Sequence, residues 1–187
     1  SIRRAGGVEV VALFHPVEKE VEAKAASFAI PHFYADFDKM IAEENFDCIH
    51  ICTPNNLHYP MAKAALLAGK HVVCEKPLAT TVEQAKELVL LAKKYNRVHA
   101  VNFNLRYYPL VRQMKRMREK NELGDVYSVV GSYLQDWLFY ATDYNWRLEP
   151  DKSGQSKAIA DIGSHLIDLV EYITGLSITE VMADFST

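Results

Sequence analysis

The stretch HVVCEKPLATT, residues 71–81, places a carboxylate, an amine and a proline directly after a run of apolar residues. The apolar run is typical of a buried strand, and Pro77 cannot continue the hydrogen-bond ladder of a central strand. In an open α/β sheet, ligands bind outside the carboxyl ends of the strands. Lys76 is therefore either a functional side chain at a ligand-binding strand end or part of a solvated turn. This stretch alone leaves both interpretations open.

A second candidate pair, Asp161 and His165, lies in ADIGSHLIDL, residues 160–169. Side chains four residues apart share one face of a helix. A histidine has an unperturbed pKa near 6.5, so it can take a proton from a hydroxyl group, and Asp161 could orient the imidazole, stabilise its charge or contact a substrate. The alternative makes Asp161 a helix N-cap and His165 a half-buried packing residue. A metal pair is a third possibility, but the sequence offers no convincing further ligand, and we expect no metal.

The composition excludes several classes of partner. The 187 residues carry a net charge of -3 with a pI near 6.2, which gives no electrostatic reason to expect nucleic acid or an anionic membrane as partner. No apolar run is long enough to cross a bilayer and no signal-peptide pattern is present, so we expect a cytoplasmic protein. The three cysteines, Cys48, Cys52 and Cys74, match neither a zinc site nor a redox pair, and we expect them to be small buried side chains in a reducing compartment.

Strand and helix patterns alternate through the first half of the chain. Strands are predicted over 8–14, 47–54, 71–77 and 98–103, and helices over 17–29, 36–44, 55–68 and 80–95. Helix starts are predicted from capping residues: Asp36, then Asn55 or Asn56, then Thr80 with Glu83 or Thr81 with Gln84. This alternation predicts βαβ units and a mostly parallel sheet.

The rhythm changes after Asn104, where we place a domain boundary that separates residues 1–104 from residues 105–187. A helix over 111–120, a long strand over 124–137, a polar loop over 140–157, a helix over 160–174 and a strand over 178–185 are predicted next. The chain opens with SIRRAGGVEVV, in which the glycine pair is a turn signal without a phosphate-binding fingerprint. We therefore expect the first strand with its glycine-rich turn, and the rest of the second domain, to lie outside these residues.

Five motifs follow one another in a recognisable order. They are CTPNNLH (52–58), EKP (75–77), NFNLRYYP (102–109), YNWR (144–147) and DIGSHLID (161–168). Any one of them is weak, but together they run along nearly the whole chain. In this order the chain resembles the glucose-fructose oxidoreductase, inositol dehydrogenase and rhizopine-catabolism family of nicotinamide-dependent sugar oxidoreductases.

The resemblance implies an α/β fold: a doubly wound parallel sheet of the Rossmann type, followed by the start of an α+β substrate domain with a mainly antiparallel sheet. It implies NAD or NADP as cofactor. Lys76 would bind the substrate hydroxyl and stabilise developing alkoxide character, while His165 takes the proton, with Asp161 beside it. The Lys76–Pro77 peptide bond is often cis in relatives.

The resemblance also implies a set of cofactor-binding residues: Thr53, Pro54, Asn55, His58, Glu75, Lys76, Pro77, Asn102, Trp146 and Arg147. His58 could equally be a helix-start residue that is hydrogen-bonded locally, and Trp146 and Arg147 could equally cover a domain interface. Arg106 and Tyr107 are substrate-side candidates, although an aromatic–basic pair at a domain junction is more often packing.

Two positions depart from the family pattern. His15 stands where relatives specific for NAD carry an acidic residue for the adenosine ribose, so His15 or Lys19 could favour the phosphorylated cofactor, or His15 could simply bind a ribose hydroxyl. SGQSKAIADIG, residues 153–163, replaces a run of glycines and leaves the shape of the substrate loop open.

The leading hypothesis is a dehydrogenase that moves hydride between NAD(P) and a secondary hydroxyl of a sugar, polyol or related small molecule. The alternatives are a cofactor-recycling epimerase or glycosidase of the same fold and a sensor that has lost catalysis. The intact Lys76, Asp161 and His165 argue against the sensor. A homo-oligomer is expected from the family resemblance.

Overall fold

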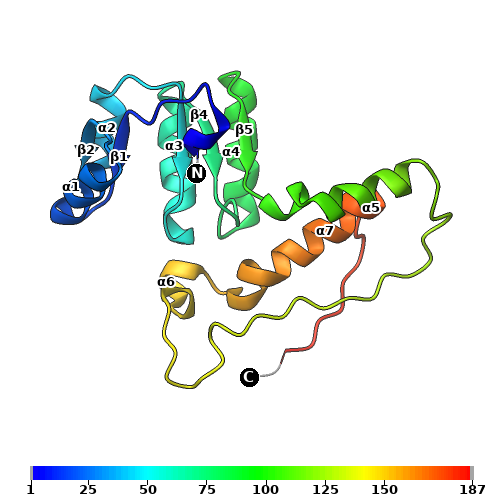
Figure 1. Ribbon diagram of the computed structural model, residues 1–187. Coiled ribbons are helices and arrows are strands. Elements are labelled where there is room, and N and C mark those ends of the chain that lie inside the picture. The colour runs from blue at the N-terminus through cyan, green and yellow to red at the C-terminus, as the bar shows by residue number, and fades with distance from the viewer. Residues whose placement is uncertain (1, 186–187) are drawn as a thin grey trace. The chain divides into compact units, whose positions relative to one another are not determined.

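The computed structural model describes residues 2–185 (Figure 1). The chain forms two compact units that interleave along the sequence. The sheet unit comprises Ser1–Thr53, Leu57–Cys74 and Thr81–Ala100, and the helical unit comprises Pro54–Asn56, Glu75–Thr80 and Val101–Thr187. The short segments after two strands thus belong to the helical unit, and the predicted single boundary near residue 104 stays a prediction.

The first part of the sheet unit is a parallel strand pair with two helices against it. Strand β1 (Ala12–Phe14) pairs in parallel with β2 (His32–Tyr34), and Ala12 lies opposite His32. Helices α1 (Glu18–Ser27) and α2 (Phe37–Glu43) pack against these strands. The predicted βαβ pattern is confirmed here, although the strand predicted over 8–14 is formed only in its last three residues.

The second part is a three-stranded sheet in the order β3-β4-β5. It contains β3 (Cys48–Ile51), β4 (His71–Cys74) and β5 (His99–Val101), and β3 pairs with β4 in parallel. Helices α3 (Asn55–Leu67) and α4 (Val82–Lys94) follow β3 and β4 in sequence. Alternate residues of β3 and β4 are buried, and these residues form the core with apolar side chains of the helices, among them Leu66 and Leu88.

Local capping sets the ends of these helices. The Asp36 carboxylate accepts a hydrogen bond from the Lys39 N–H at 3.0 Å, and the Thr81 hydroxyl accepts one from the Gln84 N–H at 3.3 Å, which confirms Asp36 and the second of the two threonine alternatives. The cap predicted at Asn55 or Asn56 stays a prediction. Helix α3 begins at Asn55, and the Asn55 amide donates to the Ser153 carbonyl.

The helical unit is built from short helices. They are η2 (Asn104–Tyr107), α5 (Pro109–Glu119), η3 (Trp146–Leu148), α6 (Pro150–Ser153), the π-helical turn η4 (Ile159–Gly163) and α7 (Ser164–Thr174). Helix α5 packs along α7 (Figure 1). The helices predicted over 111–120 and 160–174 are confirmed, except that the second begins with a π-helical turn. The short helices η3 and α6 lie within the predicted loop.

The two strands predicted after residue 105 are wrong. Between residues 105 and 185 the structure contains no strand, and 124–137 and 178–185 are irregular segments. A strand requires a hydrogen-bonding neighbour, and none of the described segments pairs with these two. Their apolar side chains, such as Tyr127 and Met182, are consequently exposed. The antiparallel sheet expected in the second domain is therefore absent from the described residues.

The cysteine prediction holds for only one of the three residues. Cys74 is fully buried in β4, whereas Cys48 and Cys52 are exposed. The apolar pattern of the surrounding strand indicates burial, but the alternation along β3 points Cys48 away from the core. None of the helices within residues 2–185 combines the length and the apolar character needed to span a lipid bilayer.

Candidate active site

Lys76 follows strand β4 and binds one residue of the π-helical turn. Its ammonium group donates to Asp161 Oδ1 at 2.9 Å and also to the main-chain carbonyl of Asp161. The Lys76 side chain is only 12% exposed, and the Lys76–Pro77 peptide bond is cis, as the family resemblance implies. A cation that is so largely withdrawn from water requires a countercharge. Asp161 provides that charge across 85 residues of sequence.

Asp161 receives a second cation from Arg147. The Nε of Arg147 donates to the same Oδ1 at 3.0 Å. Two cations on one carboxylate leave a net positive charge around this group, which favours negative charge that develops nearby. Asp161 lies inside η4, which Ala158 precedes, so the alternative that made Asp161 a helix N-cap is wrong.

The orientation of Arg147 is fixed by its neighbours. Asn145 caps η3 by accepting the Arg147 N–H at 3.1 Å, and Asn145 Oδ1 also accepts from Nη1 at 3.2 Å. The guanidinium lies 4.5 Å from the ring centre of Trp146 and 5.5 Å from that of Trp137. These contacts stabilise a cation that faces Asp161, and Trp146 contributes through its ring.

His165 lies in the first turn of α7 and is only 9% exposed. The rings of Phe103 and Tyr133 meet it edge-on, with centres 6.0 and 6.1 Å away. Among the described residues, its Nδ1 is buried and has no hydrogen-bond partner. Burial, and then the positive charge of Lys76, lower the pKa of His165 below its ordinary value, while nearby carboxylates act in the opposite direction. The imidazole is therefore neutral at pH 7 and can accept a proton.

The side chains at the strand ends are also engaged within the helical unit. Asn102 donates to Glu75 Oε1 at 2.6 Å, and Asn55 donates to the Ser153 carbonyl at 2.9 Å. Arg106 binds the buried Asp168, whereas Tyr107 is 75% exposed. Asn102 and Glu75 thus lie next to each other. Of the predicted Arg106–Tyr107 pair, Arg106 is engaged with Asp168, whereas the Tyr107 side chain is exposed to solvent.

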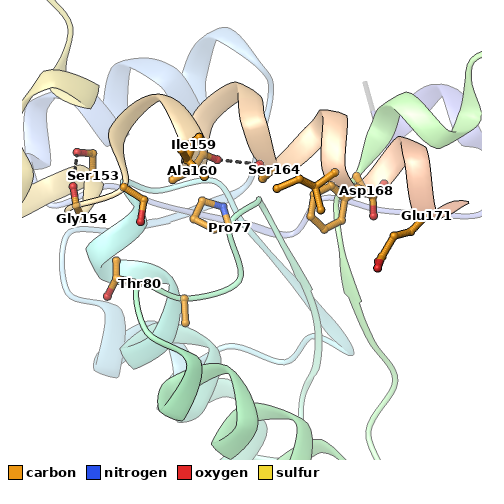
Figure 2. Close-up of a pocket in the computed structure, with 13 residues that line it drawn as sticks. Pro77, Thr80, Ser153, Gly154, Ile159, Ala160, Ser164, Asp168 and Glu171 are labelled. Carbon is orange, nitrogen blue, oxygen red and sulfur yellow. Dashed lines mark hydrogen bonds between the residues drawn. The ribbon is translucent and has the colours of Figure 1, made fainter. Parts of the chain in front are cut away.

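A cavity of about 420 Å³ lies in the helical unit (Figure 2). Pro77 and Thr80 line it from the loop after β4, and Ser164 and Asp168 line it from α7. The hydroxyls of Ser153 and Ser164 on its wall are bonded to main-chain carbonyls of Glu149 and Ala160 at 2.9 and 2.8 Å. Lys76, Asp161 and His165 are not among its lining residues, whereas their neighbours Pro77, Ala160 and Ser164 are.

The sheet unit carries three of the predicted residues. The Thr53 hydroxyl after β3 is buried and has no hydrogen-bond partner within the described chain. His58 is 1% exposed and donates from Nε2 to the Thr53 carbonyl at 2.9 Å, which is the local hydrogen bond of the two alternatives. His15 accepts the Val17 N–H at Nδ1, 3.2 Å away, and its Nε2 lies 3.5 Å from the Glu20 carboxylate.

A family model described as "Oxidoreductase family, NAD-binding Rossmann fold" matches residues 1–103. The chain belongs to the GFO/IDH/MocA oxidoreductase family. A second model, described as the GFO/IDH/MocA C-terminal domain, matches residues 111–187. The sequence-based assignment to this family and to a Rossmann-type α/β fold is confirmed.

Relatives of this GFO/IDH/MocA chain include enzymes that act on sugars. Levoglucosan dehydrogenase of Pseudarthrobacter phenanthrenivorans is 39% identical over 161 residues, which are 83% of this chain and 40% of the relative. D-glucoside 3-dehydrogenase of Escherichia coli is 30% identical over 169 residues, 90% of this chain and 47% of the relative. The chain thus spans about half the length of the curated relatives it matches.

A solved structure of levoglucosan dehydrogenase in complex with NADH and levoglucosan has a similar fold. It superposes with a TM-score of 0.84 at 35% identity, over 89% of this chain and 45% of that one. The matched domain is an NAD-binding Rossmann fold, which agrees with the NAD(P) prediction. The buried Thr53 hydroxyl fits such a cofactor, because a polar ligand group at the end of β3 would satisfy it.

Asp168 forms a two-pronged ion pair with Arg106 in this GFO/IDH/MocA chain, and it was not among the residues predicted from the sequence. A signal was present: an acidic residue stands within the apolar run of 166–170, three residues after His165. Buried carboxylates are rare without a partner. This pattern predicts a cation nearby, but the sequence does not say which one.

Proposed function

We propose that the whole protein is an NAD(P)-dependent oxidoreductase that transfers hydride between the nicotinamide and a secondary hydroxyl of a sugar, a polyol or a related small molecule. The observation that carries this proposal is the pairing of Lys76 with Asp161, with the neutral His165 at the start of the following helix. The names of the relatives, which are dehydrogenases of levoglucosan and of D-glucosides, support a carbohydrate substrate.

The donors of Lys76 suit this reaction. A lysine ammonium has three N–H donors, and Asp161 accepts two hydrogen bonds from Lys76 through Oδ1 and its main-chain oxygen. The third donor is available for a substrate oxygen. In the oxidation direction, Lys76 stabilises the negative charge that develops on this oxygen as its proton leaves.

His165 is the proton acceptor in this proposal. Its lowered pKa keeps the imidazole neutral at pH 7, and its Nδ1 has no competing partner within the described residues. A neutral imidazole can take the hydroxyl proton as a general base. When bound, the nicotinamide supplies the hydride acceptor. In the reverse direction, the protonated imidazole returns the proton to the carbonyl oxygen.

We infer that residues at the strand ends and in η3 hold the cofactor. In the sheet unit these are His15, Thr53 and His58. In the helical unit they are Pro54, Asn55, Glu75, Lys76, Pro77, Asn102, Trp146 and Arg147. The orphaned Thr53 hydroxyl supports this assignment. His15 replaces the carboxylate that excludes a 2′-phosphate, so we propose that both NAD and NADP are accepted.

The experiment is a turnover assay of the whole protein with NAD⁺ and NADP⁺ against anhydrosugars, glucosides, free aldoses and polyols. Formation of reduced nicotinamide is measured by its absorbance, and the oxidised sugar is identified by mass spectrometry. We expect turnover with at least one carbohydrate. Tight cofactor binding, shown by calorimetry, combined with no reduction on any of these substrates would contradict the proposal.

A further inference from the structure

Arg106 and Asp168 form a two-pronged ion pair beside His165. Arg106 belongs to η2 and donates from Nε to Asp168 Oδ2 at 2.8 Å and from Nη2 to Oδ1. Asp168 is 9% exposed, and the Arg106 side chain is 41% exposed. Paired N–H donors that match both oxygens of a carboxylate fix the orientation of the carboxylate and also stabilise its charge. The pair joins two segments that are 62 residues apart in sequence.

Aromatic rings connect this pair to the imidazole. The Arg106 guanidinium lies 4.9 Å from the ring centre of Tyr172 and 5.8 Å from that of Phe103. The Phe103 ring is also the one that meets His165 edge-on. Asp168 stands three residues after His165 on α7, so the two side chains lie on neighbouring positions of one helix face. A shift of Arg106 would therefore move both Asp168 and the ring that supports His165.

We propose that Arg106 and Asp168 are positioning residues that hold the His165 imidazole in place and balance the charge around it. This inference rests on the proposed function, in which His165 exchanges the substrate proton. Neither residue contacts the imidazole nitrogens in the structure. Both act through the α7 backbone, the Phe103 ring and the electric field.

The charged groups that face His165 come from several elements. Lys76 and Glu75 come from the loop after β4, Asp161 comes from η4, and Asp168 comes from α7 itself. The Tyr133 ring contacts His165 from the irregular segment 124–137, and Arg106 is connected to α7 by its ion pair with Asp168. Lys76 lowers the pKa of His165, whereas Asp161, Asp168 and Glu75 raise it. The Arg106 guanidinium offsets part of the Asp168 charge while the pair is intact.

Breaking the pair from either side should thus have opposite effects. Arg106→Gln leaves the Asp168 carboxylate without its countercharge, so the pKa of His165 rises. Asp168→Asn removes a negative charge and leaves the Arg106 cation unpaired, so the pKa of His165 falls. Arg106→Gln combined with Asp168→Asn removes both charges and returns the pKa toward that of the unmodified protein. A pair that contributed only to folding would not produce shifts of opposite sign.

The test is the NMR titration of the histidine ring protons in the whole protein without substrate. The seven histidines are distinguished by comparison with a His165→Asn spectrum. The acid limb of kcat/KM for sugar oxidation is measured in parallel. Arg106→Lys keeps the charge but loses the fork, so its titration stays near that of the unmodified protein while kcat falls by about tenfold through misplacement of the ring. Lys120→Gln, an exposed cation of the same unit that lies 3.9 Å from Glu122, is the control.

Opposite shifts of the His165 titration in Arg106→Gln and Asp168→Asn, with partial return in the double variant, would support the proposal. Unmoved titrations, or shifts of the same sign, in variants that circular dichroism shows to be folded would overturn it. If Asp168→Asn does not fold, the other two variants decide. An upward shift of the His165 pKa in Arg106→Gln but not in Arg106→Lys would support the proposal, and the absence of this shift in Arg106→Gln would overturn it. Because this titration needs no turnover, its failure is distinguishable from a failure of the proposed reaction.

Discussion

Two polar contacts of the sheet unit and two of the helical unit differ in the sequence distance that they span. In the sheet unit, Asp36 binds a main-chain N–H three residues away and His58 binds a carbonyl five residues away. In the helical unit, Asn55 binds Ser153 across 98 residues, and Lys76 binds Asp161 across 85. These two hydrogen bonds of the sheet unit lie at the starts of helices α2 and α3. The two hydrogen bonds of the helical unit join segments that are distant in sequence. No strand pairing holds these segments together, because residues 105–185 contain no strand.

The difference in sequence distance predicts which substitutions should affect stability and which should affect activity. Joining segments that are distant in sequence costs chain entropy, and in the helical unit side-chain bonds contribute to the connection. The same bonds bring the proposed catalytic groups together. We therefore expect loss of a polar contact in the sheet unit to lower stability with little change in activity, and loss of a contact between Lys76 and Asp161 in the helical unit to lower activity.

The largest effect is expected for Lys76→Met. Loss of the ammonium removes the stabilisation of developing negative charge, so kcat/KM should fall by roughly 10²- to 10⁴-fold. Loss of the charge also raises the pKa of His165 and moves the acid limb of the pH profile to higher pH. Lys63→Met is the matched control, because Lys63 pairs with Glu87 in the sheet unit at 2.7 Å. Equal losses of activity in the two variants would remove the contrast between the units.

Asp161→Asn should have the next largest effect. The amide keeps an oxygen acceptor but removes the countercharge of Lys76 and Arg147, and kcat should fall by roughly 10²-fold. Because the Asp161 charge raises the pKa of His165, its removal lowers that pKa. The acid limb of the kcat/KM profile should then move to lower pH. Steady-state kinetics across pH measure both quantities, and movement of the limb to higher pH would contradict the assignment.

Asn55→Ala tests the hydrogen bond between Asn55 and Ser153, which joins residues 98 positions apart in sequence. Asn55 and Ser153 are both buried, and the variant leaves the Ser153 carbonyl without this donor. An unsatisfied buried group costs about 1–3 kcal/mol, so urea denaturation should show a loss of this size. Asn56→Ala, at an exposed position on the same helix, should be close to neutral. A similar loss in both variants would show that the Asn55 contact does not stabilise the fold.

The smallest effect is expected for Asp36→Ala. Removal of the α2 cap leaves the Lys39 N–H without its acceptor, and this should lower the free energy of unfolding by about 1 kcal/mol. Turnover should stay unchanged. Asp36→Asn keeps an acceptor oxygen and should be nearly neutral. A clear drop in kcat for Asp36→Ala would show that polar contacts of the sheet unit also affect activity, against the expected contrast between the two units.

Local signals account for the parts of the fold that were predicted correctly. The alternation of strands and helices up to residue 101 follows from hydrophobic periodicity and from capping residues such as Asp36 and Thr81. The family motifs identified Lys76, Asp161 and His165 as candidates, and the structure shows how the first two are connected. These features depend on neighbours in sequence or on short motifs.

The features that were missed depend on partners distant in sequence. The segment 124–137 has the composition of a strand, but pairing is decided by a neighbouring segment that periodicity does not reveal. Arg147 was predicted to approach the cofactor or substrate or to cover a domain interface. In the structure its guanidinium pairs with Asp161, because Asn145 and Trp146 fix its direction. Asp168 carried a burial signal, but the sequence did not show that Arg106 was its partner.

The π-helical turn at Ile159–Gly163 has a consequence for how the protein tolerates insertions and deletions. A wide turn accommodates one residue more than an α-helical turn, so residues before and after it are out of phase by about 100° relative to a continuous α-helix. Deletion of one residue there would straighten the helix and rotate the segment that leads back to Arg147 away from its present direction. Asp161 would present a different side to Lys76 although every charged side chain was kept. The direction of the Asp161 side chain therefore depends on the number of residues in this turn as well as on their identity.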